Sequence, residues 1–209
     1  MTRRKTTAAV DPHAALVWPC IILGIDAGAE SGFALVGPAR GQVRLSGQVS
    51  AHEAVRRQTV VRLAFQVAAL CRLPLAIVRE DWTPGGKFDS VRNATGLGAR
   101  WGWWEEQVRM ARLSHPDVDL RAKAAKNLEA LRLYPIQWWS RAIGGKKPPR
   151  DEGLRIVRER ASAIVGRPVE SDEGVAVLLA TVGQQHEGVA AMLPKRAWHA
   201  PGDWRPRPE

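Results

Sequence analysis

Residues 21–36 read Ile21-Ile22-Leu23-Gly24-Ile25-Asp26-Ala27-Gly28-Ala29-Glu30-Ser31-Gly32-Phe33-Ala34-Leu35-Val36. This stretch predicts a buried strand over 20–26, a glycine-rich turn, and a second strand over 32–37. The first strand carries Asp26 to its end, where a buried carboxylate is costly unless a cation meets it. Two interpretations therefore stay open for Asp26: it caps the turn, as Asp often does, or it binds a divalent metal or a phosphate-bound ion.

The composition is that of a basic protein of one domain. The chain has 209 residues, a formal net charge of +10 and a pI near 10.5, which favours a polyanionic partner and most often nucleic acid. An anionic membrane is the rival partner, but no basic amphipathic helix supports it and no segment reaches the length of a membrane span. A merely solvated basic surface is the plain alternative. Cys20 and Cys71 have neither metal-site nor disulfide spacing, so we expect a reducing, cytoplasmic location without a signal sequence.

We expect three parts along the chain. They are a basic flexible arm over 1–19, a folded domain over 20–192, and a Pro- and Trp-containing tail over 193–209. Within the domain, polar–apolar alternation, capping residues and Pro or Gly breaks mark the elements. Further strands are predicted over 42–49, 75–82 and 130–134. The first predicted helix runs from a capping box at Ser50 and Glu53 to Arg72. Further helices are predicted over 90–113, 116–128 and 151–165, and a last one from Ser171 onward. This order, with a three-strand meander first, resembles the ribonuclease-H-like fold: a mixed five-stranded sheet flanked by helices.

Three acidic residues fall at element ends that this fold can bring together. Asp26 ends the first strand, Glu80 ends the strand over 75–82, and Asp172 begins the last helix. Converging carboxylates repel one another unless a cation neutralises them, and oxygen ligands suit Mg²⁺ or Mn²⁺. A pair of such ions supports phosphodiester cleavage. The alternatives are that Asp172 is an ordinary first-turn acid and that Glu80 forms a surface ion pair.

At these residues the sequence resembles the RuvC-type Holliday-junction resolvases, particularly their phage-like branch. The resemblance covers roughly residues 20–185. Three segments in the first half carry it: Ile22–Ala34, in which Ala27 stands where proline is common, Val78–Trp82 and Gly96–Gly102. Two more follow in the second half. The Pro-x-x-Trp segment Tyr134–Trp139 precedes the basic loop with Gly144 and Lys146, and Asp172–Ala180 falls on the final Asp-x-x-Asp-Ala-type helix.

The last segment departs from the family pattern. With Asp172 in the first acid position, Val175 takes the second, where an acid is expected. A register shifted by two residues would instead pair Glu170 with Glu173. We prefer Asp172 with Glu173 helping, because the apolar body that follows then aligns without a gap. The resemblance thus implies the metal ligands Asp26, Glu80, Asp172 and Glu173, with two ions only if the second site is complete.

The resemblance also implies a homodimeric, Mg²⁺-dependent endonuclease that nicks branched DNA symmetrically in a bacterial or phage-infected cell. The helix over 90–113 is the expected dimer face, because Trp101, Trp103 and Trp104 are too bulky to expose freely; plain core packing is the alternative. Gly96, Gly98 and Gly102 cost helix stability and suggest a close approach of another element.

A basic region flanks the predicted site. Residues 121–160 hold eleven Lys or Arg against four Asp or Glu, and such residues bind phosphates with little sequence reading. Lys146 and Lys147 are expected nearest the scissile phosphate, and Lys146 is assigned a catalytic role. Trp82 is expected to stack on unpaired bases, although such aromatics more often seal a core. The predicted DNA contacts are Lys87, Arg100, Lys146, Lys147, Arg150 and Trp82.

Three functions are therefore compared. The first is an endonuclease that cleaves four-way and other branched DNA. The second is a branched-DNA-binding protein of the same fold that has lost its chemistry at Val175. The third is an ATPase of the actin and sugar-kinase type, because Gly24–Gly28 also resembles their first phosphate loop; however, the chain is short for their two lobes.

Overall fold

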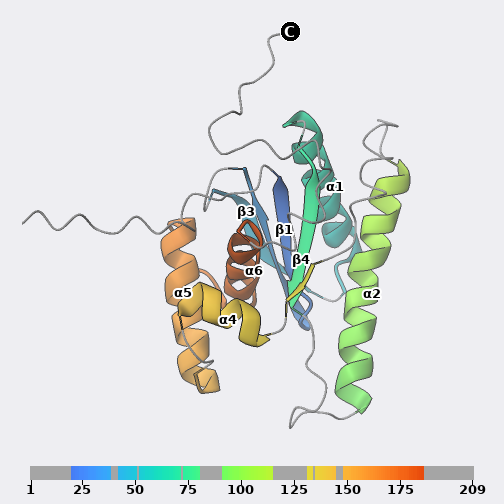
Figure 1. The fold of residues 1–209 in the computed structure, drawn as a ribbon. Coiled ribbons are helices and arrows are strands. Elements are labelled where there is room, and N and C mark those ends of the chain that lie inside the picture. Colours follow the sequence, from blue (N-terminus) through green and yellow to red (C-terminus); the bar gives the residue numbers. More distant parts are fainter. Residues whose placement is uncertain are drawn as a thin grey trace, which may run out of the picture.

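A mixed five-stranded sheet forms the centre of the protein in a computed structural model (Figure 1). The structure describes residues 20–38, 42–50, 52–71, 73–80, 91–114, 131–133, 135–144 and 148–185. The strand order is β3-β2-β1-β4-β5, with β1–β2–β3 antiparallel and β4 and β5 parallel to β1. The strands are β1 (Ile21–Asp26), β2 (Glu30–Val36), β3 (Val43–Ser50), β4 (Leu75–Glu80) and the short edge strand β5 (Leu131–Leu133). The predicted ribonuclease-H-like arrangement is confirmed.

Helices cover both faces of this sheet (Figure 1). On one face, α1 (Ala54–Leu70) and α2 (Val91–Ser114) pack against the sheet through one apolar cluster. On the other face, α4 (Pro135–Ile143), α5 (Arg150–Val165) and α6 (Ser171–Gly183) share a second cluster. The α6 helix is buried along nearly its whole length. It therefore forms the core element of its layer, lying between the sheet and α5.

Alternation along the strands decides which side chains face α6. In β1, Ile21, Leu23 and Ile25 belong to the cluster on the α1–α2 side, whereas Ile22 belongs to the α6 side. Gly24 also faces α6, because a methyl group there would lie 2.4 Å from the carbonyl oxygen of Ala176. Because side chains alternate along a strand, Asp26 follows Ile22 and Gly24 on the α6 face.

The first helix begins later than the capping box predicted. Ser50 is the last residue of β3, and α1 begins at Ala54 after Glu53. Only the return half of the box forms, in which the Ser50 amide donates to Glu53 Oε2 at 2.9 Å. The Ser50 backbone is held in the β-ladder with Glu30, so the sheet overrides the local capping signal.

Two further sequence expectations require correction. No helix was predicted directly after the strand over 130–134, but α4 begins there at Pro135, where the fixed φ and missing N–H of proline are tolerated. Gly96, Gly98 and Gly102 were expected to permit a close approach, yet within the part of the chain that the structure describes a methyl group on any of them would meet nothing within 4 Å. The predicted helix over 116–128, the arm over 1–19 and the tail over 193–209 lie outside the described residues.

Candidate active site

Two of the predicted acids lie at adjacent strand ends. The parallel pairing of β1 with β4 runs through Gly24 opposite Val78 and Ile25 opposite Arg79, so Asp26 and Glu80 occupy the next position of this register. Val78 belongs to the cluster on the α6 side, and Glu80 follows it by two residues. Both half-buried carboxylates therefore stand on the same face, at the carboxyl ends of two neighbouring strands.

The first turn of α6 brings Asp172 to the same end of the sheet. Gly32 lies directly opposite Asp26 in the β1–β2 ladder, and a methyl group on Gly32 would lie 1.8 Å from the carbonyl oxygen of Asp172. A methyl group on Gly28 would lie 3.6 Å from Asp172 Oδ2, which places that carboxylate over the β1–β2 turn. Glycine is required at position 32 because helix backbone and strand backbone are in contact there.

Negative charge gathers around Asp172. Burial raises the pKa of Asp172, and the neighbouring carboxylates of Glu30 and Glu170 raise that pKa further. The sequence pattern alone does not single out Glu30. A signal was nevertheless present, because Glu30 precedes Gly32 by two residues on β2 and so shares its α6-facing side. The causes of the raised pKa are therefore burial and the two neighbouring carboxylates, which come from β2 and from the residue before α6.

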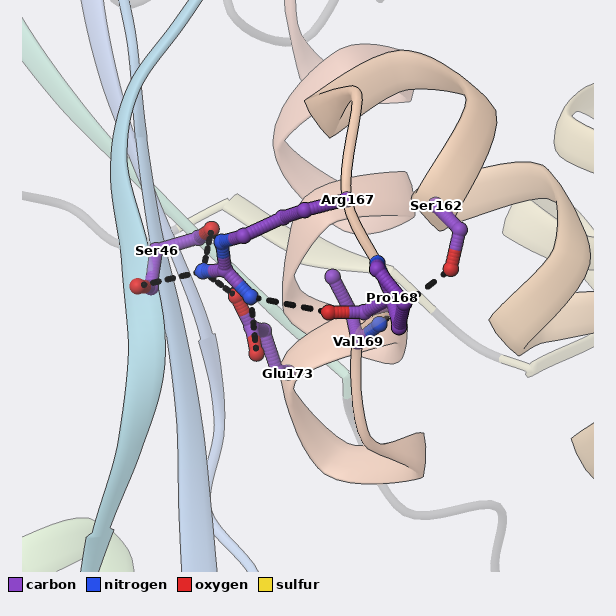
Figure 2. A network of polar contacts seen from close by, with 6 residues as sticks. All are labelled: Ser46, Ser162, Arg167, Pro168, Val169 and Glu173. Atoms are coloured by element: carbon purple, nitrogen blue, oxygen red, sulfur yellow. Dashed lines mark hydrogen bonds and ion pairs between the residues drawn. The ribbon is translucent and has the colours of Figure 1, made fainter.

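Glu173 has different surroundings, although it follows Asp172 directly. Its buried carboxylate accepts a hydrogen bond from Ser46 Oγ at 2.6 Å and forms an ion pair with Arg167 (Figure 2). The side chain therefore reaches β3, whereas that of Asp172 lies over the β1–β2 turn. The structure does not bring Glu173 to Asp26 and Glu80 as the predicted ligand set requires; Arg167 and Ser46, which sequence analysis did not identify, supply its partners.

Position 175 belongs to the hydrophobic core. Val175 is 8% exposed and packs in the cluster between the sheet, α5 and α6. An acid at this position would enter an apolar environment unless α6 were rotated about its axis. In the alternative register, Glu170 is the exposed residue before α6 and acts on the pKa of Asp172, while Glu173 is paired with Arg167.

The acids share one end of the sheet but do not form a complete metal-binding group among the described residues. Among the described residues, no group of three or more His, Cys, Asp or Glu side chains is placed closely enough to hold a metal ion. The donor set is nevertheless all oxygen, which suits Mg²⁺, and the metal assignment stays a prediction.

The predicted DNA-binding residues fall on both sides of the sheet or outside the described residues. Arg100 lies half-buried on α2, and Arg150 begins α5 on the opposite face. Arg158 and Arg160 are exposed along α5, where Arg155 pairs with Glu159 at 2.7 Å. Lys87, Lys146, Lys147 and Trp82 lie outside the described residues. No helix in the described part of the chain is both long and apolar enough to span a membrane.

Comparison with known proteins supports the fold. No protein-family model matches the sequence, and no curated protein matches it. Thermus thermophilus RuvC in complex with a Holliday junction substrate is similar, with a TM-score of 0.51 and 19% identity over 83% of this chain and 96% of that chain. The chain has the fold of RuvC.

Two further solved structures are similar to the chain at lower TM-scores. A second structure of Thermus thermophilus RuvC gives a TM-score of 0.46 and 19% identity over 82% of this chain and 96% of that one. The yeast mitochondrial Holliday junction resolvase Ydc2 gives 0.41 and 12% identity over 88% of this chain and 86% of its own.

Proposed function

We propose that the protein is a structure-specific endonuclease that cleaves four-way and other branched DNA with the help of a divalent metal. The observation that carries this proposal is the placement of Asp26, Glu80 and Asp172, which come from three elements to one face at one end of the sheet. The fold it shares with RuvC, which is solved in complex with a Holliday junction substrate, supports the substrate class.

The three acids are the proposed ligands of Mg²⁺ or Mn²⁺. Such an ion, when bound, activates water and stabilises the leaving oxygen of the phosphodiester. Asp26 and Glu80 are held by paired strands and so supply fixed oxygens, while Asp172 approaches from the first turn of α6. Glu30 adds a further carboxylate beside Asp172. In this proposal Glu173 is not a ligand, because its carboxylate pairs with Arg167.

The DNA is proposed to be held by exposed basic residues near this end and along α5. Arg150, Arg158 and Arg160 are exposed on that helix, and the strongly positive net charge of the chain favours a polyanion. Lys146 and Lys147, which precede α5 in the sequence, remain the proposed contacts to the scissile phosphate.

We also propose a homodimer formed through α2. In the part of the chain that the structure describes, a methyl group on any of its three glycines would meet nothing within 4 Å, and Trp103 is 41% exposed. Met110 follows Trp103 by seven residues, on the same side of the helix, and is also exposed. Two active sites on one junction would then nick both strands.

The test is the cleavage of a four-way junction by the Asp26→Asn variant with Mg²⁺. We expect cleavage to fall by about a hundredfold or more, because metal assistance is worth several kcal/mol, while junction binding in EDTA is kept. Asp151→Asn is the matched control, since it removes an exposed carboxylate from the first turn of α5. Undiminished cleavage by Asp26→Asn would overturn the proposed centre.

The second candidate function is a branched-DNA-binding protein without chemistry. Two observations favour it: Val175 fills the position of an expected acid with an apolar core side chain, and no three acids in the described residues gather around one point. Tight junction binding by the unaltered protein, with no cleavage in Mg²⁺ or Mn²⁺, would establish this function instead.

A further inference from the structure

A polar network joins three segments beside the candidate site. Arg167 lies between α5 and α6, Glu173 lies in the first turn of α6, and Ser46 lies on the edge strand β3 (Figure 2). Arg167 Nη2 donates to Glu173 Oε1 at 2.5 Å and to the carbonyl oxygen and Oγ of Ser46, both at 3.2 Å. Its Nη1 donates to the carbonyl oxygen of Pro168 at 3.0 Å and lies 3.4 Å from Glu173 Oε2.

The guanidinium satisfies a carboxylate that would otherwise be costly to bury. Glu173 is 5% exposed, and a buried charge needs both an opposite charge and hydrogen bonds. Both carboxylate oxygens face the planar fork of Arg167, and Ser46 Oγ donates to Oε1. A lysine in place of Arg167 would keep the charge but lose this two-pronged geometry.

The network holds the start of α6 where a local cap would normally do so. Glu170 precedes the helix and makes no side-chain capping bond. Glu173 stands at the third helical position, from which a carboxylate commonly returns to the amide of the capping residue. Here it reaches β3 instead, so the first turn of α6 is fastened to the sheet and not to its own preceding residue.

The turn fastened in this way is the one that carries Asp172. The carbonyl oxygen of Asp172 lies against Gly32, and its carboxylate lies over Gly28. A small sideways shift of the first turn would move this carboxylate away from the end of β1. We propose that Arg167 is a positioning residue that acts through Glu173 and Ser46 to hold Asp172 at the metal centre. The inference rests on the function proposed above.

The experiment uses two substitutions that keep the net charge, Ser46→Ala and Arg167→Lys, in the full chain. Mn²⁺ affinity is measured by calorimetry, and amide hydrogen exchange is followed over 171–175. We expect both variants to bind Mn²⁺ about tenfold more weakly or worse, as loss of a group that orients a metal ligand usually costs about 10–100-fold. Exchange in the first turn of α6 should also quicken. Arg155→Lys, in the exposed pair with Glu159, should change neither readout.

The outcomes separate this inference from the proposed function. If the unaltered protein binds no Mn²⁺, or if Asp172→Asn binds it equally well, the metal centre fails, and the positioning role is then decided by hydrogen exchange alone. Unchanged affinity and unchanged exchange in both variants would overturn the role of Arg167. Tighter Mn²⁺ binding would also overturn it, because it would show that the network withholds Glu173 from the metal as a ligand.

Discussion

Helices α6 and α2 lie on opposite faces of the sheet and use glycine in opposite ways. Under α6, Gly24 and Gly32 in the strands bring helix and sheet backbones into contact, with a methyl group at either position overlapping a carbonyl oxygen of α6. In α2 the glycines lie in the helix itself and face open space in the described structure. The glycines under α6 allow close packing between two elements of this chain. Among the described residues, the glycines of α2 contact no other element.

The two helices therefore differ in how tightly they pack: α6 is in close backbone contact with the sheet, whereas α2 has an exposed side. The α6 helix carries Asp172 and packs its backbone directly against β1 and β2 at Gly24 and Gly32. The α2 helix buries Trp101 and Trp104 in the core but leaves Trp103 at the surface. The alternative of plain core packing therefore holds for Trp101 and Trp104, and Trp103 is 41% exposed with the Arg57 guanidinium over its ring.

The largest expected effect is that of Gly32→Ala. The added methyl group would lie 1.8 Å from the carbonyl oxygen of Asp172, so α6 must move, and we expect a loss of about 3 kcal/mol or more in the free energy of unfolding. Gly98→Ala on α2 is the opposing variant and should stabilise the protein by about 0.5–1 kcal/mol through helix propensity. Urea denaturation at low protein concentration measures both; equal effects would break the contrast between the two helices.

Replacing Val175 by Asp tests whether α6 can accept the missing acid. Since Val175 is buried in an apolar cluster, we expect Val175→Asp to cost about 2–4 kcal/mol of stability at neutral pH and to leave cleavage no higher. Val55→Asp, at a site on α1 that is 76% exposed, should cost less than about 0.5 kcal/mol. A stable Val175→Asp variant with increased cleavage would mean that α6 can rotate toward the site.

Trp103→Ala tests the open side of α2. If a second copy covers this helix, loss of the indole should weaken dimerisation about tenfold or more, because central aromatic residues commonly contribute 1–2 kcal/mol or more. Leu70→Ala, at the strongly exposed end of α1, is the control. Sedimentation equilibrium gives the dissociation constants, and an unchanged value for Trp103→Ala would remove α2 from the interface.

The smallest expected effect concerns the charge on Asp172. The pKa of this carboxyl is raised in the folded state by burial, Glu30 and Glu170, so the ionised form opposes folding. The penalty is absent below the ordinary Asp pKa and develops as the pH rises through the raised value. We expect Asp172→Asn to increase the melting temperature slightly at pH 7 and not at pH 3. An increase of the same size at both pH values would contradict a titration effect.

Local pattern predicted most of the strands and helices. The strands ending at Asp26 and Glu80 and the helix beginning at Ser171 lie within a few residues of their predicted bounds. The errors have tertiary causes: pairing with Glu30 keeps Ser50 in β3, and Pro135 begins α4 after the strand whose end it marks. The local sequence preferences of a residue at a boundary do not determine which of the two neighbouring elements will include it.

The sequence alone determined the sheet, the two strand-end acids and the acidic start of a buried helix, because the period-two and helical patterns are local properties. Only the tertiary structure decided what each residue of that helix faces. Successive side chains point about 100° apart around a helix, so Asp172 lies over the β1–β2 turn, Glu173 reaches Ser46 on β3, and Val175 enters the core. These directions depend on how α6 docks against strands more than a hundred residues earlier in the chain, and no local pattern encodes that docking.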